Sequence, residues 1–321
     1  MILSSSKTKA DHIGLDIDTK ERVEPTLKDL MSLYRPASLL PSWTRSTRAQ
    51  QTGGYVSALK GRGMDYVESR PYQAGDDFRT LDWRVTARTG RPHTKVFREE
   101  RERPVYICCD FSPSMFFGTQ GVFKSVQAAR TAALIAWKAQ QSGDRVGGLV
   151  FTAGTHHENP PDRGKSGVIR LLKKLVDAGK LAEPAMNETA SRSLGKALAR
   201  LRRIAKPGSL IFMISDFREY NDTCESDLAH LAQHNDVAIL FINDPFEAAL
   251  PSTNGRGKVT NGMSDLEIIF GNDSINQRYT ENFSARYERI KKLSSNYRIL
   301  MSRLTTTDEP LPVVQRLLGL Y

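Results

Sequence analysis

The stretch that decides the fold is residues 105–114, which read VYICCDFSPS. Its first five residues are apolar without interruption, and an acid, Asp110, follows them. A short unbroken apolar run is typical of a strand that is buried on both faces of a sheet. We therefore predict a strand over residues 105–110 and a polar loop that starts at Asp110.

The same pattern recurs along the chain and alternates with helical periodicity. We expect strands over 105–110, 145–151, 209–215, 237–242 and 298–303, helices over 122–141, 166–178, 194–204, 222–235 and 275–296, and a hairpin over 256–270. The polar, proline-containing residues 156–161 are expected to form a loop. Alternating strands and helices predict an α/β fold, with a doubly wound, mostly parallel sheet.

The N-terminal third has a different texture. Residues 42–104 are rich in Arg, Gly and aromatic residues, contain several turn signals and show no long helical period. We predict three parts: a tail over 1–34 with a short helix at 26–34, a smaller β-rich segment over 35–103, and the α/β domain over 104–321.

Composition limits the cellular context. The 321 residues are 39% hydrophobic and 26% charged, with a net charge of +10 and three cysteines. This balance is typical of a soluble globular protein, and so few cysteines do not make a disulfide framework. No apolar run approaches the ~20 residues of a membrane span, and the N-terminus lacks the apolar core of a signal peptide. We expect a cytoplasmic protein without a membrane span.

The loop after the first strand has the pattern D-x-S-x-S, formed by Asp110, Ser112 and Ser114. A second acid, Asp216, follows the strand predicted at 209–215. In a parallel sheet, ligands bind at the carboxyl ends of the strands, where both acids are expected. Carboxylate and hydroxyl oxygens suit a hard cation, Mg²⁺ or Mn²⁺, which would then accept a carboxylate from a partner. The alternative is a serine turn that caps the next helix.

Residues 102–304 resemble the von Willebrand factor A superfamily, a Rossmann-type fold. The resemblance implies a metal-ion-dependent adhesion site (MIDAS) that includes Asp110, Ser112, Ser114 and Asp216. That family also uses a threonine just before a Gly-x-Ala-Leu helix start, here Gly195-Lys196-Ala197-Leu198. The aligned residue is Arg192, whose charge would repel a cation. The nearby hydroxyl residues that can substitute for the threonine are Thr189, Ser191 and Ser193.

Residues 70–88 form the densest polar and aromatic stretch, RPYQAGDDFRTLDWRVTAR. This stretch resembles the signature of the domain-of-unknown-function 58 family. We expect its three acids to pair with arginines and fix the small segment, with Trp83 as an anchor; the alternative is a catalytic or metal cluster of these acids. The residues assigned to this structural role are Arg70, Tyr72, Gly75, Asp76, Asp77, Arg79, Asp82, Trp83 and Arg88.

Three functional hypotheses follow. The family resemblance implies a non-enzymatic adaptor that partners a MoxR-type AAA+ ATPase in chaperone-like maturation of client proteins. The positive charge offers a second hypothesis, a nucleic-acid-binding protein, because residues 192–206 contain six Arg or Lys and no acid. The third is a metal-dependent hydrolase that uses Asp76, Asp77 and Asp82.

Overall fold

The computed structural model describes residues 18–43, 64–99, 103–180, 193–249, 255–260, 265–270 and 273–319. The chain divides into two compact units. The larger unit contains residues 1–44 and 103–321, and the smaller unit contains residues 45–102. Residues 35–43, which the sequence assigns to the β-rich segment, therefore belong to the larger unit.

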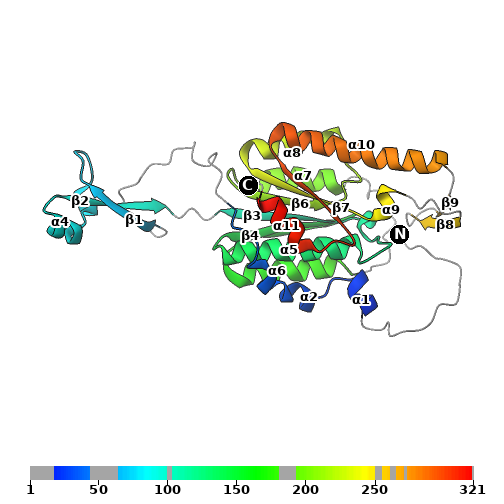
Figure 1. Ribbon diagram of the computed structural model, residues 1–321, viewed down its shortest axis with the longest axis horizontal. Helices are drawn as coiled ribbons and strands as arrows, with labels where there is room; N and C mark the ends of the chain where they lie inside the picture. The colour runs from blue at the N-terminus through cyan, green and yellow to red at the C-terminus, as the bar shows by residue number, and fades with distance from the viewer. Residues whose placement is uncertain are drawn as a thin grey trace. The chain divides into compact units, whose positions relative to one another are not determined.

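A six-stranded, mostly parallel sheet forms the centre of the larger unit, as the sequence predicts (Figure 1). The strand order is β10-β7-β6-β3-β4-β5. The strands are β3 (Pro104–Phe111), β4 (Arg145–Thr152), β5 (His156–Asp162), β6 (Leu210–Ser215), β7 (Asp236–Asn243) and β10 (Leu300–Thr305). Only β5 among the strands of this sheet runs antiparallel to its neighbour.

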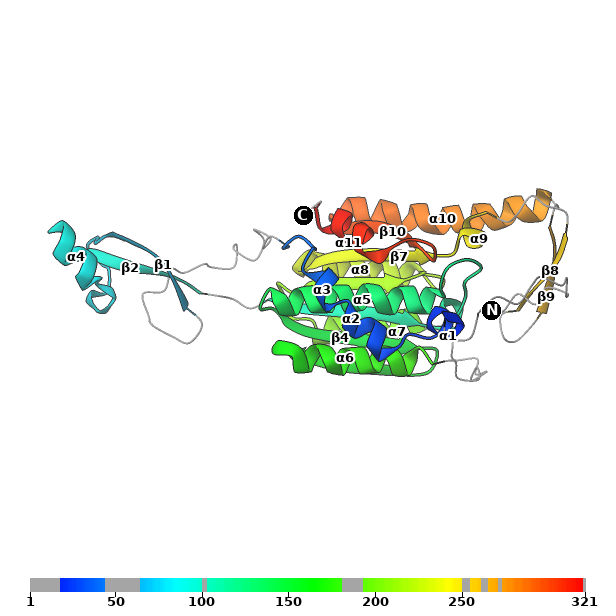
Figure 2. The same cartoon turned by 60° about the horizontal axis from the view of Figure 1, so that its bottom comes forward.

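Helices cover both faces of this sheet (Figure 2). One face packs against α2 (Leu27–Ser32), α3 (Tyr34–Ala37), α5 (Lys124–Gln141), α6 (Gly164–Ala178) and α11 (Pro310–Gly319). The other face packs against α7 (Ser193–Ile204), α8 (Asp222–His234) and α10 (Asp273–Tyr297). The remaining elements of this unit are α1 (Asp18–Val23), the 3₁₀ turn η3 (Pro113–Met115), α9 (Pro245–Ala248) and the antiparallel hairpin of β8 (Gly255–Thr260) and β9 (Asp265–Phe270).

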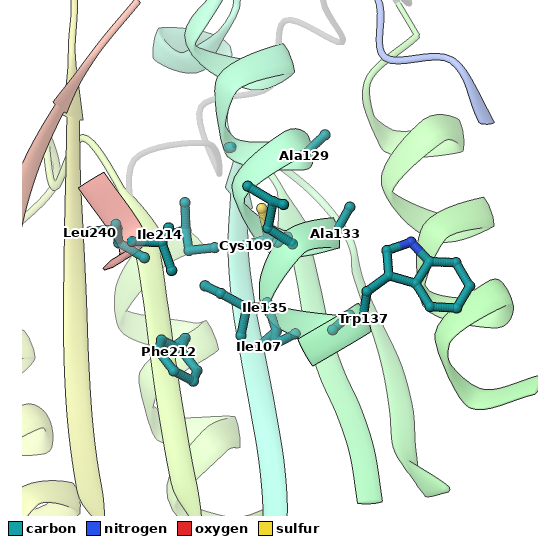
Figure 3. Packing of buried hydrophobic residues seen from close by; sticks show 14 of the residues in the cluster. Ile107, Cys109, Ala129, Ala133, Ile135, Trp137, Phe212, Ile214 and Leu240 are labelled. Atoms are coloured by element: carbon teal, nitrogen blue, oxygen red, sulfur yellow. The ribbon is translucent and has the colours of Figure 1, made fainter. Parts of the chain in front are cut away.

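The apolar run of β3 contributes side chains to the hydrophobic clusters on both faces of the sheet, because successive side chains of a strand point to opposite faces. Ile107 and Cys109 pack towards α5, as the close view of this core shows (Figure 3), whereas Tyr106 and Cys108 belong to the cluster on the other face. Both cysteines are buried, so they act as small apolar side chains.

The tail predicted for residues 1–34 includes the helix α2, which packs against the body of the larger unit. Leu30 is fully buried, and its carbonyl accepts a hydrogen bond of 3.0 Å from the indole of Trp137 in α5. Arg130 of α5 also pairs with Asp29. These contacts fix α2 on the larger unit. The sequence predicts the helix itself, but as part of a tail.

The edge strand β5 replaces the loop predicted for residues 156–161. Its sequence contains Pro160 and Pro161, which lack the N–H that an inner strand needs, and prolines are tolerated at a sheet edge. The register of the β4–β5 pair shifts between Val146 and Gly148. A Cβ on the intervening Gly147 would lie 2.9 Å from Pro161, so this close approach requires glycine.

The smaller unit is an antiparallel pair of β1 (Met64–Pro71) and β2 (His93–Glu99). The connection between them contains the 3₁₀ turn η2 (Phe78–Thr80) and the helix α4 (Trp83–Thr89). The strands agree with the predicted β-rich character, but α4 is not predicted. Asp82 caps its first turn, and Gly90 ends it in the left-handed conformation at φ 71°.

Candidate functional site

The predicted metal residues lie at the carboxyl ends of two neighbouring parallel strands. Asp110 is close to the end of β3, and Asp216 directly follows β6. The two strands pair in register, with Cys109 opposite Ile214. Both carboxylates are buried. The sheet topology therefore brings together two acids that are separated by more than a hundred residues in the sequence.

The D-x-S-x-S loop folds back onto its own aspartate. One carboxylate oxygen of Asp110 accepts the backbone N–H of Ser112 at 2.7 Å, and the other accepts the hydroxyl of Ser215 at 2.5 Å. The hydroxyl oxygens of Ser112 and Ser114 lie 3.2 Å apart. A hydrogen bond from Ser114 also favours the ionised form of Asp216. The four predicted ligands thus form one cluster, and Ser215 extends it.

A buried lysine, which the sequence analysis missed, completes this cluster. Lys124 is the first residue of α5 and has no solvent-exposed surface. Its ammonium donates to Asp216 at 2.7 Å and to Glu247 in α9 at 2.6 Å. Because a buried charge is costly unless it is paired, these contacts are what allow Lys124 to stay charged at this position.

The two strand-end aspartates have opposite electrostatic environments. Burial, together with the nearby charge of Asp216, raises the pKa of Asp110 to about 7. Burial also opposes ionisation of Asp216, but the ammonium of Lys124 more than offsets it and lowers the pKa of Asp216 to about 2. The ion pairs of the described residues here involve Asp216 and Glu247, but not Asp110. Asp110 is therefore the acid of the cluster without a cationic partner among the described ion pairs, and its environment disfavours the ionised form.

A second missed acid, Asp244, ties the loops around the site together. It follows β7, and its carboxylate accepts hydrogen bonds from the backbone and hydroxyl of Thr119 and from the hydroxyl of Thr306. It also caps α9, in a capping box with Glu247. The pattern that predicts Asp216, an acid after an apolar strand, also applies to Asp244. Lys124, a lone lysine at the start of an apolar helix, carries no comparable signal in the sequence.

The hydroxyl substitutes for the family threonine are only partly described. Thr189, Ser191 and also Arg192 lie outside the described residues. Ser193 begins α7, and its hydroxyl donates to Glu219 at 2.9 Å. In the described part of the chain, Ser193 therefore contacts the loop after Asp216 rather than Asp110 or the two motif serines.

The oxygens of the cluster fit a hard divalent cation. Neighbouring ligands of an octahedral Mg²⁺ at ~2.1 Å lie about 3 Å apart, close to the separation of the Ser112 and Ser114 hydroxyls. The raised pKa of Asp110 marks negative charge that a cation would relieve. The described residues contain no group of three or more His, Cys, Asp or Glu side chains that could hold a metal. A cation here would therefore depend on the serine hydroxyls.

In the smaller unit, one of the predicted arginine–acid pairs forms. Arg70 makes a two-pronged ion pair with Asp76, at 2.7 and 2.9 Å, which lowers the pKa of that carboxyl. Asp77 instead accepts the backbone N–H of Arg79, and Asp82 accepts two backbone N–H groups of α4 and the hydroxyl of Ser69. The acids thus hold the local backbone.

The other predicted residues of this segment have different surroundings. Gly75 has φ 108°, which favours glycine at the turn, and the rings of Tyr72 and Phe78 lie 5.3 Å apart. Arg79, Trp83 and Arg88 are exposed. The role of Trp83 as an anchor stays a prediction.

The basic run of α7 is partly neutralised by ion pairs. Arg200 pairs with Glu158 of β5, and Arg202 pairs with Asp227 of α8. These carboxylates reduce the positive charge that α7 can offer to a nucleic acid.

Residues 68–290 match the family described as Protein of unknown function DUF58. The chain belongs to this family. The DUF58 match begins in β1 and ends in α10, so it includes residues 70–88 and both strand-end aspartates.

Uncharacterized proteins of Mycobacterium bovis and Mycobacterium tuberculosis are 30% identical to this DUF58 chain over 199 residues, or 62% of its length. The chain spans 61% of the length of these relatives.

Two solved structures show weak similarity to this DUF58 protein. The conserved hypothetical protein BatB from Bacteroides thetaiotaomicron is 16% identical, with a TM-score of 0.44, over 68% of this chain and 97% of BatB. A mutant of the PilB minor pilin from Streptococcus sanguinis is 10% identical, with a TM-score of 0.33, over 72% of this chain and 64% of the pilin. Neither likeness informs the function. None of the described helices is long and apolar enough to span a membrane.

Proposed function

We propose that this DUF58 protein is a non-enzymatic, cytoplasmic adaptor of the von Willebrand factor A type. In this proposal, Asp110, Ser112, Ser114 and Asp216 hold Mg²⁺ or Mn²⁺ at the carboxyl ends of β3 and β6. A partner protein supplies a carboxylate as a further ligand. The cation supplies the positive charge that attracts this carboxylate, and two neutral hydroxyl ligands leave much of that charge available.

One observation carries the proposal. The hydroxyls of Ser112 and Ser114 lie close together next to the buried carboxylate of Asp110, which takes part in none of the described ion pairs. Lys124 pairs with Asp216 and Glu247 and not with Asp110, so Asp110 is the acid of the site without a cationic partner among the described ion pairs. The partner that we propose is a MoxR-type AAA+ ATPase, acting on client proteins in chaperone-like maturation. This partner follows from the family resemblance.

Isothermal titration of Mg²⁺ and Mn²⁺ into the full chain tests the metal. We expect saturable heat with the wild type and none with Asp110→Ala or with the double variant Ser112→Ala/Ser114→Ala. The matched control is Asp222→Ala, which removes a carboxylate that is 97% exposed on α8. Equal heats for the wild type and both site variants would refute the metal site.

A pull-down with the MoxR-type ATPase encoded nearest to this chain tests the partner. We expect retention in Mg²⁺, and loss in EDTA and with Asp110→Ala. Retention that is unchanged in EDTA would separate the partner from the metal, and no retention under either condition would refute the partner.

A further inference from the structure

The two most exposed large apolar side chains among the described residues lie close together in sequence. Phe78 and Trp83 are each 71% exposed. Aromatic rings bury more apolar area than other side chains when they are covered, so leaving two of them in water forgoes stabilisation. Their exposure makes this segment a candidate binding surface.

These two aromatic residues are presented by locally fixed backbone. Phe78 begins the 3₁₀ turn that Asp77 caps, and its ring contacts Tyr72. Trp83 begins α4, which Asp82 caps at the N-terminus. The hydroxyls of Thr80 and Thr94, 2.7 Å apart, join the turn to β2. Fixed presentation lowers the entropy cost of binding, so the rings are prepared for a partner.

The charge of this surface has one sign. Between residues 72 and 95 the exposed charged side chains are Arg79, Arg84, Arg88, Arg91 and Lys95. The three acids of the same stretch are not exposed, because they cap backbone N–H groups or pair with Arg70. The surface therefore complements a negatively charged partner.

The spacing on α4 favours a helical protein segment over a nucleic acid. Trp83 and Ala87 lie one turn apart on the helix, and Arg84 and Arg88 form the adjacent row. A partner helix with an apolar row next to an acidic row would complement α4, because its apolar row can pack on Trp83 and Ala87 while its acids face Arg84 and Arg88. The small side chain of Ala87 lets such a helix approach closely, whereas base stacking would need only the rings.

We infer that the surface formed by Phe78, Arg79, Trp83, Arg84 and Arg88 docks an acidic amphipathic helix of a partner protein. This docking surface belongs to the smaller unit and requires no metal. Trp and Arg are the residues that most often dominate the affinity of protein interfaces, so Trp83 is the expected centre of the contact.

A synthetic peptide of about 20 residues tests this inference, with Leu pairs at i, i+4 and Glu pairs on the adjacent row. The full chain is titrated with the peptide in EDTA and in Mg²⁺. Trp83 is the readout because the other two tryptophans, Trp43 and Trp137, are 7% and 3% exposed. We expect a saturable blue shift of the emission and reduced acrylamide quenching, with the same affinity in both buffers.

Matched variants locate the contact by fluorescence anisotropy of the labelled peptide. We expect Trp83→Ala to weaken binding by about tenfold or more, and Arg84→Ala/Arg88→Ala to weaken it by a similar factor that shrinks in high salt. Two control variants should change the affinity by less than about twofold. Leu39→Ala removes an apolar side chain that is 65% exposed just after α3, and Lys173→Ala removes an exposed cation of α6. Asp110→Ala should also leave peptide binding unchanged, so failure of the metal site and failure of this surface are distinguishable.

Three outcomes would overturn the inference. The first is that the acidic peptide shows no saturable binding up to ~1 mM, or binds no more tightly than a control peptide in which glutamine replaces each glutamate. The second is preferential binding of a single-stranded oligonucleotide that the same variants abolish. The third is a wild-type dimer in light scattering that Trp83→Ala dissociates, since the surface would then bind a second copy of the chain.

Discussion

The strand-end cluster and the docking surface use their charged residues in opposite ways. In the cluster, the carboxylates of Asp110, Asp216 and Glu247 are buried and the only cation that pairs with them in the described structure is Lys124. In the stretch that carries the docking surface, Asp77 and Asp82 bind backbone groups and Asp76 pairs with Arg70. The arginines of the docking surface face solvent. The comparison teaches that the charge a site offers to a ligand depends on which side chains are already paired, rather than on the number of acids and bases in a stretch.

Removing the buried cation should break the cluster side of this comparison most strongly. Lys124→Met leaves Asp216 and Glu247 buried without a counter-charge, so we expect a loss of about 3–5 kcal/mol in the free energy of unfolding. Urea denaturation of the full chain followed by circular dichroism measures it. Lys173→Met, at an exposed lysine of α6, is the control and should change stability by less than ~0.5 kcal/mol. A loss for Lys124→Met as small as that of the control would contradict the pairing.

The raised pKa of Asp110 predicts a pH dependence of stability. Without a metal, the folded state holds a proton on Asp110 up to about pH 7, whereas the unfolded chain releases it near pH 4. The folded state therefore binds more protons between these values, and this group's contribution to stability falls as pH rises through that window, by at most ~1.4 kcal/mol per pH unit. Denaturation in EDTA from pH 4 to 8 measures the slope.

Asp110→Asn is the variant that isolates this slope because it removes the titrating group. The difference in unfolding free energy between wild type and variant should change across pH 4–7 and become constant above pH 7. A difference that is independent of pH would show that Asp110 has no raised pKa.

Asp82, next to the docking surface, should matter through backbone capping, with a smaller effect than Lys124. Asp82→Ala removes the cap of α4 and the acceptor of Ser69, so we expect a loss of ~1–2 kcal/mol in the local stability of α4. Hydrogen exchange of the backbone amides of residues 84–89 measures it. Asp82→Asn retains a capping oxygen and should lose less. Equal protection in all three chains would show that the cap does not stabilise α4.

The exposed aromatic residues should contribute least to folding. We expect Trp83→Ala to change the stability of either unit by less than ~0.5 kcal/mol, because its side chain is mostly in water. Phe212→Ala, in the core of β6, is the contrasting variant and should cost ~3–5 kcal/mol. Thermal unfolding of both variants would test this. A large loss for Trp83→Ala would mean that the residue serves folding rather than docking.

The sequence predicted most of the larger unit because buried parallel strands carry a local signature. The runs ending at Asp110 and Asp216 are short, apolar and followed by an acid, and the structure places both at adjacent strand ends. The short helix α4 was missed because seven residues are too few for a clear period, although Asp82 and Gly90 marked its ends. The helix α11 was also not predicted.

Long-range pairing explains why the site was predicted only in part. Lys124 is separated from its partners Asp216 and Glu247 by 92 and 123 residues, so no local pattern links them. The binding of Thr119 by Asp244 is long-range in the same way, across 125 residues, whereas the cap of α9 is local. Tertiary contacts of this kind decide which acid is compensated, and hence which is available to a ligand.

The edge strand β5 has a consequence for how this protein behaves at high concentration. An exposed strand edge offers a row of free donors and acceptors on which another chain can assemble, and this is a common start of aggregation. Pro160 and Pro161 remove two successive donors from β5, and the register shift opposite Gly147 interrupts the regular spacing. The sheet is thereby protected against growth at this edge.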